Sequence, residues 1–275
     1  MEITRMMFQG LFTLRKPVTP TTSRIIVIFG IFVLVFIWDA VVRFHIISDG
    51  LLPSPFAVLG SFQELHERDA LVRNTAYSVK LNVIGYLLAI AVSVPLGFVI
   101  GLFPIFREMF RTPLEALRFL PMTALTGVFI AWFGIFDNMK IQFLAASITV
   151  YLLPVVVQRI QEVSEVYVQT VRTLSASRWP IITKVFIPAV FSKVFDDIRV
   201  LVAISWTYII VAEGVNSSSG GIGSMTYIAA RQSRIDKVFA ILLVIILVGY
   251  VQDKIFMYLD KIFFPYKYEG NEDEE

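Results

Sequence analysis

The stretch Val83–Phe106, VIGYLLAIAVSVPLGFVIGLFPIF, decides the fold class of this chain. It contains no charged side chain, and a helix needs about 20 mostly apolar residues to cross the hydrocarbon core of a bilayer. The stretch therefore predicts a membrane-spanning helix. Pro95 is compatible with it, because neighbouring groups can re-satisfy the carbonyl that a proline leaves free.

Five further apolar stretches approach the same length: Ile25–Val42, Phe119–Phe136, Ile141–Val157, Val200–Ala212 and Val238–Leu259. The composition agrees, because 56% of the 275 residues are hydrophobic, only 17% are charged, and the mean hydropathy is +0.72. Soluble domains contain about 25% charged residues. We predict an all-α membrane protein with about six transmembrane helices.

The distribution of basic residues predicts the orientation. With the N-terminus inside, sixteen of the 24 Lys and Arg residues fall in cytoplasmic segments, which favours an N-in, C-in topology. The predicted parts are a cytoplasmic N-terminal segment (1–24), a first transmembrane helix (25–45), an external segment with a short helix (46–74), a membrane core (75–263) that includes a cytoplasmic segment between spans four and five (159–198), and an acidic cytoplasmic tail (264–275).

Several chemistries are excluded by residue counts. The chain has no Cys, only two His residues (His45 and His66) and a net charge of +2, so it offers no thiolate or histidine metal site and no nucleic-acid signature. It also lacks G-x-x-x-x-G-K-[ST], the loop that cradles nucleotide phosphates. We expect no cofactor or metal in this chain and no catalytic residue.

The cytoplasmic segment 159–198 is too polar to cross a membrane. Its middle reads QTVRTLSASRWPIITKVFIP from Gln169 to Pro188, which predicts two short amphipathic helices separated by the small residues Ser175–Ser177. Such an element can dock its apolar face into a groove on another protein. It can equally rest on lipid headgroups.

This run resembles the cytoplasmic signature of bacterial ABC-importer permeases, E-A-A, three residues, G, nine residues, I-x-L-P. Gln169-Thr170-Val171, Ser175 and Val185–Pro188 occupy its positions with the right spacing. Ser177–Trp179 is similar to the nitrate/sulfonate/taurine branch of the family. Other short motifs resemble the same branch in order and spacing: Leu52–Pro55, Pro95–Gly97, Pro113–Leu114, Trp132–Gly134 and Ala212–Glu213.

The chain departs from the signature where Gln169 replaces the family Glu and Ser175 replaces the Gly. We hypothesise that Glu165, one helical turn earlier, supplies the acidic side chain instead. Ser175 is small enough for a tight turn, although positive φ costs it more than it costs Gly.

The resemblance implies a permease subunit in a bacterial cytoplasmic (inner) membrane. Its partners would be a second copy of itself, two ATP-binding subunits that hold ATP and Mg, and an external solute-binding protein. The residues implied to contact the ATPase are Glu165, Gln169, Ser175, Ala176, Ser177, Arg178, Trp179, Val185, Ile187 and Pro188. The branch implies a small solute, and we expect an anion such as nitrate, bicarbonate, sulfonate or taurine.

Polar and bent positions inside spans three and five form a second set. By resemblance they line or gate the path: Pro121, Met122, Thr123, Thr126, Ser205, Trp206, Tyr208 and Glu213. The polar ones can equally hydrogen-bond between helices. Glu213 is expected to serve as a gate or to form a salt bridge, for which Arg231 and Arg234 are the candidate partners.

Three local features of the sequence also predict structure: a glycine motif, a loop and a pair of opposite charges. Gly97 and Gly101 form a GxxxG face, which predicts a close helix contact that either moves during transport or is static. The loop Asn216–Gly223 is predicted to be flexible, either as an outer gate or as a plain connection. Asp39 and Arg43 are expected to form a local ion pair.

Two other functional classes remain. A secondary transporter or a channel would work without ATP, and it would be favoured by inverted repeats and buried ion-coupling carboxylates. We see no such repeat, although Asp39 and Glu213 keep this alternative open. An intramembrane enzyme would need a constellation of catalytic groups that the sequence does not offer.

Overall fold

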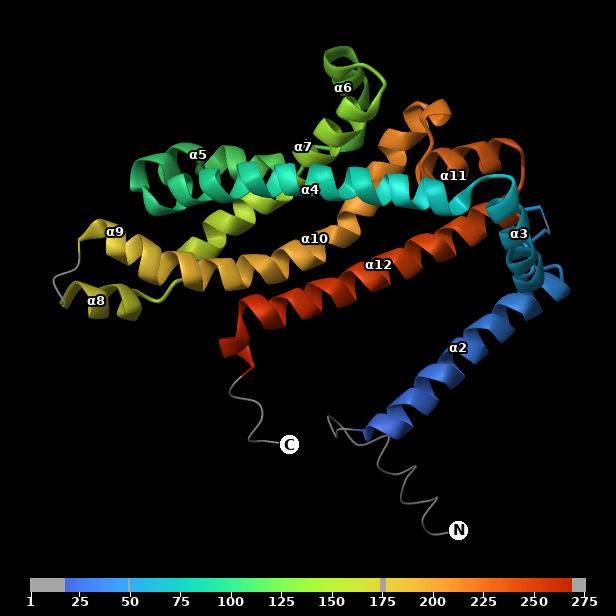
Figure 1. Cartoon of the computed structure of the whole chain (residues 1–275), viewed down its shortest axis with the longest axis horizontal. Coiled ribbons are helices and arrows are strands. Elements are labelled where there is room, and N and C mark those ends of the chain that lie inside the picture. The colour runs from blue at the N-terminus through green and yellow to red at the C-terminus, as the bar shows by residue number, and fades with distance from the viewer. Residues whose placement is uncertain (1–17, 49, 174–176, 269–275) are drawn as a thin grey trace, which may run out of the picture.

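The computed structural model describes residues 18–48, 50–173 and 177–268, and every regular element within these ranges is helical (Figure 1). The α-helices are Pro20–Arg43 (α2), Pro55–Glu67 (α3), Leu71–Leu102 (α4), Pro104–Leu117 (α5), Thr126–Phe133 (α6), Asp137–Gln161 (α7), Glu165–Thr173 (α8), Arg178–Ile181 (α9), Ile187–Val215 (α10), Ile222–Arg231 (α11) and Ile235–Phe263 (α12).

The prediction of about six transmembrane helices is confirmed. Within the described ranges, five helices are long and apolar enough to cross a membrane: α2, α4, α7, α12 and the continuous helix Arg178–Val215. A sixth crossing is possible only if α5 is counted together with Met122–Phe133. These two pieces meet at an angle of 89°.

The third predicted span, Phe119–Phe136, is therefore not one straight helix. A short 3-10 turn, Met122–Leu125, precedes the eight-residue helix α6. Pro121 stands immediately before this turn and has no backbone N–H to continue the hydrogen-bonding of α5, which ends at Leu117. Gly134 caps the other end of α6.

The fifth predicted span is longer than the apolar run Val200–Ala212 indicates. Its helix α10 begins at Ile187 and follows directly on a π-helical turn, Ile182–Phe186. Residues 187–198, which we assigned to the cytoplasmic connection, are thus the first turns of α10. Pro188 lies inside the continuous helix Arg178–Val215 and has no N–H to donate, and the π-helical turn precedes it.

Helices α4 and α7 form the centre of the molecule and run parallel to each other. A Cβ atom added at Gly97 would lie 2.5 Å from Val156, and one added at Gly101 would lie 2.8 Å from Ile160. The GxxxG face therefore makes a close backbone contact with α7, as the sequence predicted. The same pair of helices carries the fully buried side chains Phe143 and Ile148.

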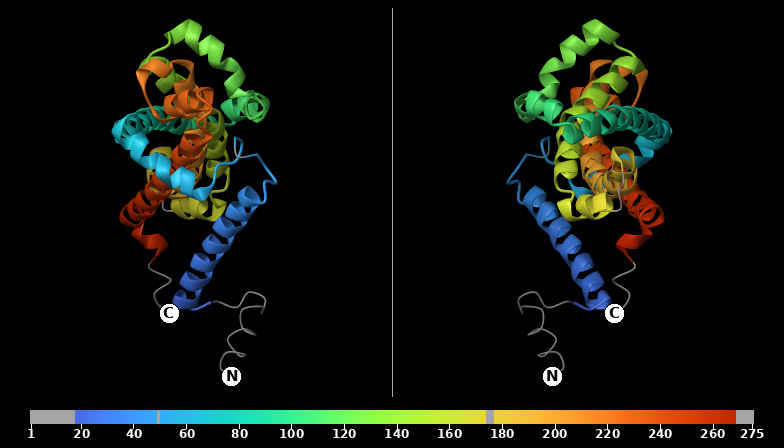
Figure 2. Two further views of the ribbon diagram at one scale, coloured as in Figure 1. Left: turned by 90° about the vertical axis from the view of Figure 1, so that its right-hand side faces the viewer. Right: turned by 90° about the vertical axis from the view of Figure 1, so that its left-hand side faces the viewer.

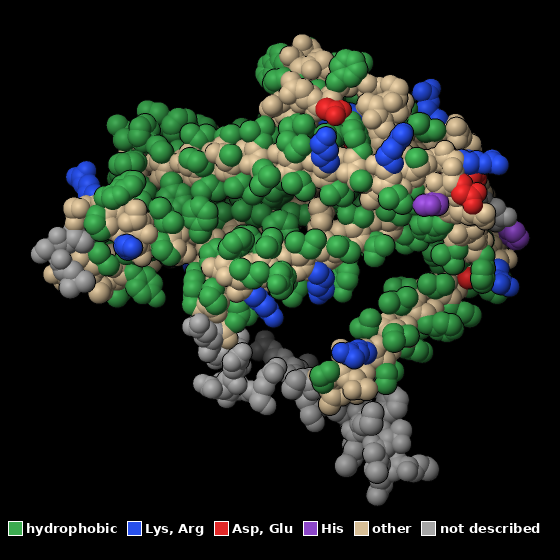
Figure 3. Space-filling view, in the orientation of Figure 1, with side chains coloured by type: hydrophobic (Ala, Val, Ile, Leu, Met, Phe, Trp, Pro, Cys, Tyr) green, Lys and Arg blue, Asp and Glu red, His purple; other side chains and the backbone are tan. Residues whose placement is uncertain are grey.

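Different helices lie at the two ends of the long axis of the molecule. Helix α3 lies at one end, and α8 and α9 lie at the other (Figure 1). Hydrophobic side chains cover most of the visible surface of the long helices, as expected for contact with lipid (Figure 3). The end that carries α3 shows acidic and basic side chains close together (Figure 3).

Helix α2 stands apart from the packed helices in both end-on views (Figure 2), and only 6% of its most apolar window is buried. It is attached near its C-terminal end, where the Trp38 indole donates a hydrogen bond of 2.9 Å to the Pro53 carbonyl and its ring packs on Phe239. The predicted pair of Asp39 and Arg43 is confirmed, with 2.6 Å between Oδ2 and Nε.

Candidate functional site

The α8–α9 excursion, residues 162–186, leaves the body of the molecule between α7 and α10. Val168 of α8, Ile181 of α9 and Val185 of the π-helical turn form its own small buried cluster. Each of the three short elements contributes one of these side chains, which are buried against one another. The described parts of the excursion, residues 162–173 and 177–186, therefore pack together as a folded unit.

The predicted ATPase-contact residues fall into three groups in the structure. Seven are exposed: Glu165, Gln169, Ser177, Arg178, Trp179, Ile187 and Pro188. Val185 is buried in the cluster, so its side chain supports the excursion and is not available to a partner. Ser175 and Ala176 lie outside the described residues. The Trp179 side chain is the most conspicuous of the exposed group, because 70% of its surface is accessible.

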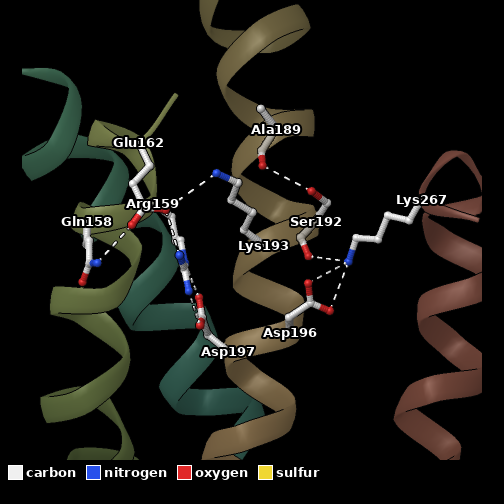
Figure 4. A network of polar contacts seen from close by, with 9 residues as sticks. All are labelled: Gln158, Arg159, Glu162, Ala189, Ser192, Lys193, Asp196, Asp197 and Lys267. Carbon is white, nitrogen blue, oxygen red and sulfur yellow. Dashed lines mark hydrogen bonds and ion pairs between the residues drawn. The ribbon is translucent and has the colours of Figure 1, made fainter. Parts of the chain in front are cut away.

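The base of the excursion is held by an ion-pair network, drawn in Figure 4. The Arg159 guanidinium on α7 donates two hydrogen bonds to the Asp197 carboxylate on α10, of 2.7 and 2.8 Å. It donates a third, of 2.8 Å, to Glu162, and Lys193 lies 3.6 Å from the same Glu162 carboxylate. Hydrogen bonding from Arg159 lowers the pKa of Glu162. The chain thus closes on itself where the excursion leaves and returns.

A second group of contacts continues this network to the C-terminal segment. Lys267 donates to both Asp196 oxygens at 3.1 Å and to the Ser192 carbonyl at 2.7 Å (Figure 4). It also donates to Asp260 at 2.8 Å. Burial lowers the pKa of Lys267, but its hydrogen bonds to Asp260 and Asp196 outweigh this effect and raise the pKa overall. Sequence reasoning missed these residues. The adjacent carboxylates Asp196 and Asp197, which precede an apolar run, were the feature of the sequence that could have indicated an ion-pair network here.

The polar residues predicted to line span five point toward three different helices. Ser205 donates to the Asn82 amide oxygen on α4 at 3.0 Å, and the Trp206 indole donates to Gln252 on α12 at 2.7 Å. The Tyr208 hydroxyl lies 3.0 Å from the hydroxyl of Tyr151 on α7. These contacts match the alternative interpretation, in which polar groups hydrogen-bond between helices, and they do not converge on one space.

Glu213 is fully buried, and its carboxylate accepts hydrogen bonds from Ser78 on α4 at 2.6 Å and from the Gly223 N–H at 2.7 Å. The expectation that Arg231 or Arg234 would pair with it is wrong. Arg234 instead binds Glu64 and Asp236, at 2.9 and 2.8 Å.

The loop that we predicted to be flexible is held by this buried group. The Gly221 N–H donates to the Asn74 side chain at 2.9 Å, and Ser224 donates to the Glu213 and Gly220 carbonyls, both at 2.8 Å. Lys140 is also fully buried and donates to Ser219. Small residues here allow a close approach of backbone to carboxylate, because a Cβ atom on Gly221 would collide with Glu213.

The four predicted path residues of span three lie around the bend between α5 and α6. Pro121 and Thr123 are exposed, whereas Met122 is buried. The Thr126 hydroxyl donates to the Thr123 carbonyl at 2.7 Å, which links the first residue of α6 to the preceding 3-10 turn.

Comparison with known proteins agrees with this architecture. Residues 93–263 match the family described as binding-protein-dependent transport system inner membrane component. An ABC transporter permease protein of Methanocaldococcus jannaschii is 30% identical over 85% of this chain and 88% of its own length. The aliphatic sulfonates transport permease SsuC of Bacillus subtilis is 29% identical (86% and 87%), and the taurine transport permease TauC of Escherichia coli is 24% identical (80% and 81%).

Solved structures show the same fold. The MetNI methionine ABC transporter in an inward-facing conformation aligns with a TM-score of 0.60 at 15% identity, covering 70% of this chain and 95% of that one. An amino acid ABC transporter bound to histidines aligns with a TM-score of 0.53, covering 74% and 96%. The residues that match the family model include the close contact between α4 and α7 and the α8–α9 excursion. The chain therefore belongs to the binding-protein-dependent transport system inner membrane components, the multi-pass permeases of ABC importers.

Proposed function

We propose that two copies of this chain form the translocation path of an ATP-driven importer for a small anion. Two separate ATP-binding subunits dock on the α8–α9 excursion and hold ATP and Mg, and an external solute-binding protein delivers the solute at the α3 end. This assignment places both termini and the excursion in the cytoplasm, in agreement with the predicted distribution of Lys and Arg.

The construction of the excursion carries this proposal. A surface helix with an exposed indole beside a rigid apolar cluster is suited to anchor in a pocket of another protein, since exposed Trp side chains are enriched at binding hot spots. Trp179 has this setting above Ile181 and Val185. Glu165 and Gln169 are exposed on the neighbouring helix α8.

The network at the base provides a route for movement. When the ATP-binding subunits close, they displace the α8–α9 excursion. The Arg159–Asp197 pair couples its two ends, so the displacement reaches α7 and α10 together. Helix α10 extends to Glu213 at the opposite end, where the carboxylate is bonded to α4 and α11. We infer that α7 and α10 move as a unit to alternate the access of the path.

The path residues have two roles in this proposal. Thr123 and Pro121 are exposed at the α5–α6 bend and face the path between the two copies. Ser205, Trp206, Tyr208 and Glu213 hold α10 against its neighbours through their hydrogen bonds. Support for an anion comes from the relatives, which are named for aliphatic sulfonates, taurine and bicarbonate.

The test is a gentle detergent extraction of the tagged chain from its native membrane, with identification of the proteins that co-purify. We expect a P-loop ATPase with the native chain and a loss of most of it with Trp179→Ala. The matched control is Trp132→Ala, because Trp132 on α6 is also 70% exposed but lies outside the excursion.

Three results would contradict the proposal. An absence of any ATPase with the native chain under several mild conditions would favour ion-gradient-driven transport. An equal loss with both Trp variants would remove the special role of the excursion. If Glu165→Gln leaves transport-coupled ATP hydrolysis unchanged, Glu165 is not the acidic contact.

A further inference from the structure

Helix α5 carries a stripe of charged residues although it forms part of the bent third span. Arg107, Arg111, Glu115 and Arg118 follow one another at helical spacing, with Glu108 beside them. The opposite side of the helix is apolar, and there Met109 and Phe110 are exposed. A helix with this pattern needs an environment that differs between its two faces.

The charged stripe lies along α7, and Glu108, Arg111, Glu115 and Arg118 remain exposed. Together with Pro154, Val157, Gln158 and Gln161 of α7, it lines a cavity of about 390 Å³. Leu114 closes the floor, in one apolar cluster with Ile100 of α4 and with Leu153 and Val157 of α7. Pro154 and Val157 belong to the predicted fourth span, so the cavity lies beside the inner end of a membrane-crossing helix.

The ion pairs within the stripe are loose. Arg107 and Glu108 are 3.7 Å apart, as are Arg111 and Glu115, and these four side chains are between 38% and 67% exposed. Arg118 makes no ion pair with any other residue in the part of the chain that the structure describes. The stripe therefore has one positive charge more than it neutralises.

Charged side chains beside the end of a membrane-crossing helix require water or a partner. An ionised group facing hydrocarbon is costly, and charges within membrane segments accordingly face a water-filled cavity or a partner. Three guanidinium groups with planar, multiple donors suit an oxygen-rich anion such as a sulfonate, carboxylate or carbonate. The two glutamates keep the net charge low, so an anion is attracted without being held tightly.

We propose that this cavity is a water-filled inner vestibule of the path, in which Arg107, Arg111 and Arg118 attract the transported anion before its release into the cytoplasm. The inference rests on the proposed import function only in identifying the anion as the transported solute. The hydration and anion selectivity of the cavity between α5 and α7 can be measured without any ATPase. Their test is therefore independent of the test of the proposed function.

The chain has no Cys, which makes a single introduced thiol a specific probe. Gln158→Cys places a thiol in the cavity, and Val92→Cys, at an exposed apolar position of α4, is the matched control. The full-length chain in inside-out and right-side-out membrane vesicles is treated with two membrane-impermeant thiosulfonates, one carrying a sulfonate and one a quaternary ammonium. Each rate is divided by the rate of the same reagent with a free thiol in solution.

We expect Gln158→Cys to react in inside-out vesicles only, with the sulfonate reagent favoured about tenfold after normalisation, the lower end of the enhancement that a charged cleft produces. Adding Arg111→Gln or Arg118→Gln should return the ratio toward the free-thiol value. Val92→Cys should react slowly with both reagents.

The opposite results are equally clear. No reaction at Gln158→Cys shows a dry site and overturns the proposal, and so does preference for the cationic reagent or reaction from the outside. Anionic phospholipid headgroups could use the same arginines. In proteoliposomes, slow labelling with phosphatidylglycerol but fast labelling with phosphatidylcholine would assign the cavity to a lipid and overturn the vestibule, whereas equal rates support it.

Discussion

Arg159 and Asp197 are joined by two parallel hydrogen bonds, of 2.7 and 2.8 Å, that connect the end of α7 to α10 at the base of the α8–α9 excursion. The chain leaves this point after Arg159 and returns to it before Asp197. A planar guanidinium that binds both carboxylate oxygens fixes orientation as well as distance. The pair is therefore suited to transmit movement of the excursion to two membrane helices at once.

The first prediction concerns Asp197→Asn. The variant should stay folded. A hydrogen bond to a charged group contributes roughly 1.5–3 kcal/mol to stability, and the loss should be smaller than this here because both side chains are partly exposed. The ratio of solute accumulated to phosphate released in proteoliposomes should fall, because the excursion can then move without α10. Radiolabelled uptake and phosphate release, measured on the same sample, give this ratio.

A comparable pair elsewhere on α10 provides the control. Arg199 and Asp253 also share two hydrogen bonds, of 2.5 and 2.9 Å, but they connect α10 to α12. Asp253→Asn should lower stability without changing the ratio. If both variants change it equally, the position at the base of the excursion has no special role.

The second prediction concerns the close contact of α4 and α7. Gly97→Ala would place a methyl group 2.5 Å from Val156, whereas nothing lies within 4 Å of a methyl group at Gly249. We expect Gly97→Ala to destabilise the protein by about 1–3 kcal/mol through overpacking. Gly249→Ala should leave stability unchanged or raise it slightly. Thermal unfolding in detergent compares the two, and equal melting temperatures would show that the helices can separate freely.

The third prediction concerns the buried carboxylate. In Glu213→Gln, only one oxygen remains to accept the hydrogen bonds that Ser78 and Gly223 donate. Since a buried donor left without its acceptor costs about 1–3 kcal/mol, we expect a loss of that size.

The readout for Glu213→Gln is thermal unfolding together with limited proteolysis at the loop 216–221, which should be cut more readily. Glu67→Gln is the control, because Glu67 is exposed and has a single side-chain partner, Gln63. Its effect should be within about 0.5 kcal/mol. A Glu213→Gln protein as stable and as protease-resistant as the native chain would show that the carboxylate does not hold the loop.

The fourth prediction is a pH dependence at the α3 end. Hydrogen bonds from Arg234 and Lys237 lower the pKa of Glu64. A carboxyl group whose pKa is lower in the folded state stabilises that state above its unfolded pKa, about 4.3. This contribution is lost as the pH falls through the folded value. The stability difference between the native chain and Glu64→Gln should therefore be constant near neutral pH and shrink below about pH 4.

Melting curves of both proteins across this pH range test the assignment. Lys237 contacts Asp69 as well, at 2.6 Å, so Glu64→Gln removes only part of the attachment of α3 to α12. A difference that stays the same down to low pH would mean that Glu64 is not ionised in this network.

The apolar runs determined most of the fold. Ile141–Val157 appears within α7 and Val83–Leu102 within α4, because a helix satisfies the backbone groups of such a segment in lipid. The predicted second span is wrong only at its end, because the chain breaks at Phe103 and residues 104–106 begin α5. The GxxxG contact between α4 and α7 was also predictable, since small residues at helical spacing allow close approach. The first short amphipathic helix of the excursion was recognisable from the spacing of its apolar residues and appears as α8. The second is not a separate short helix, because α9 and the π-helical turn continue directly into α10.

The partners of individual side chains were decided by the tertiary structure alone. Charge and order along the chain suggested Arg231 or Arg234 for Glu213, but folding brings Ser78 and Gly223 to it instead. In the same way, Arg159 and Asp197 are far apart in sequence and meet only because α7 and α10 pack together. Hydropathy fixes which segments enter the membrane, whereas the identity of each polar contact depends on how the helices are rotated and placed against one another.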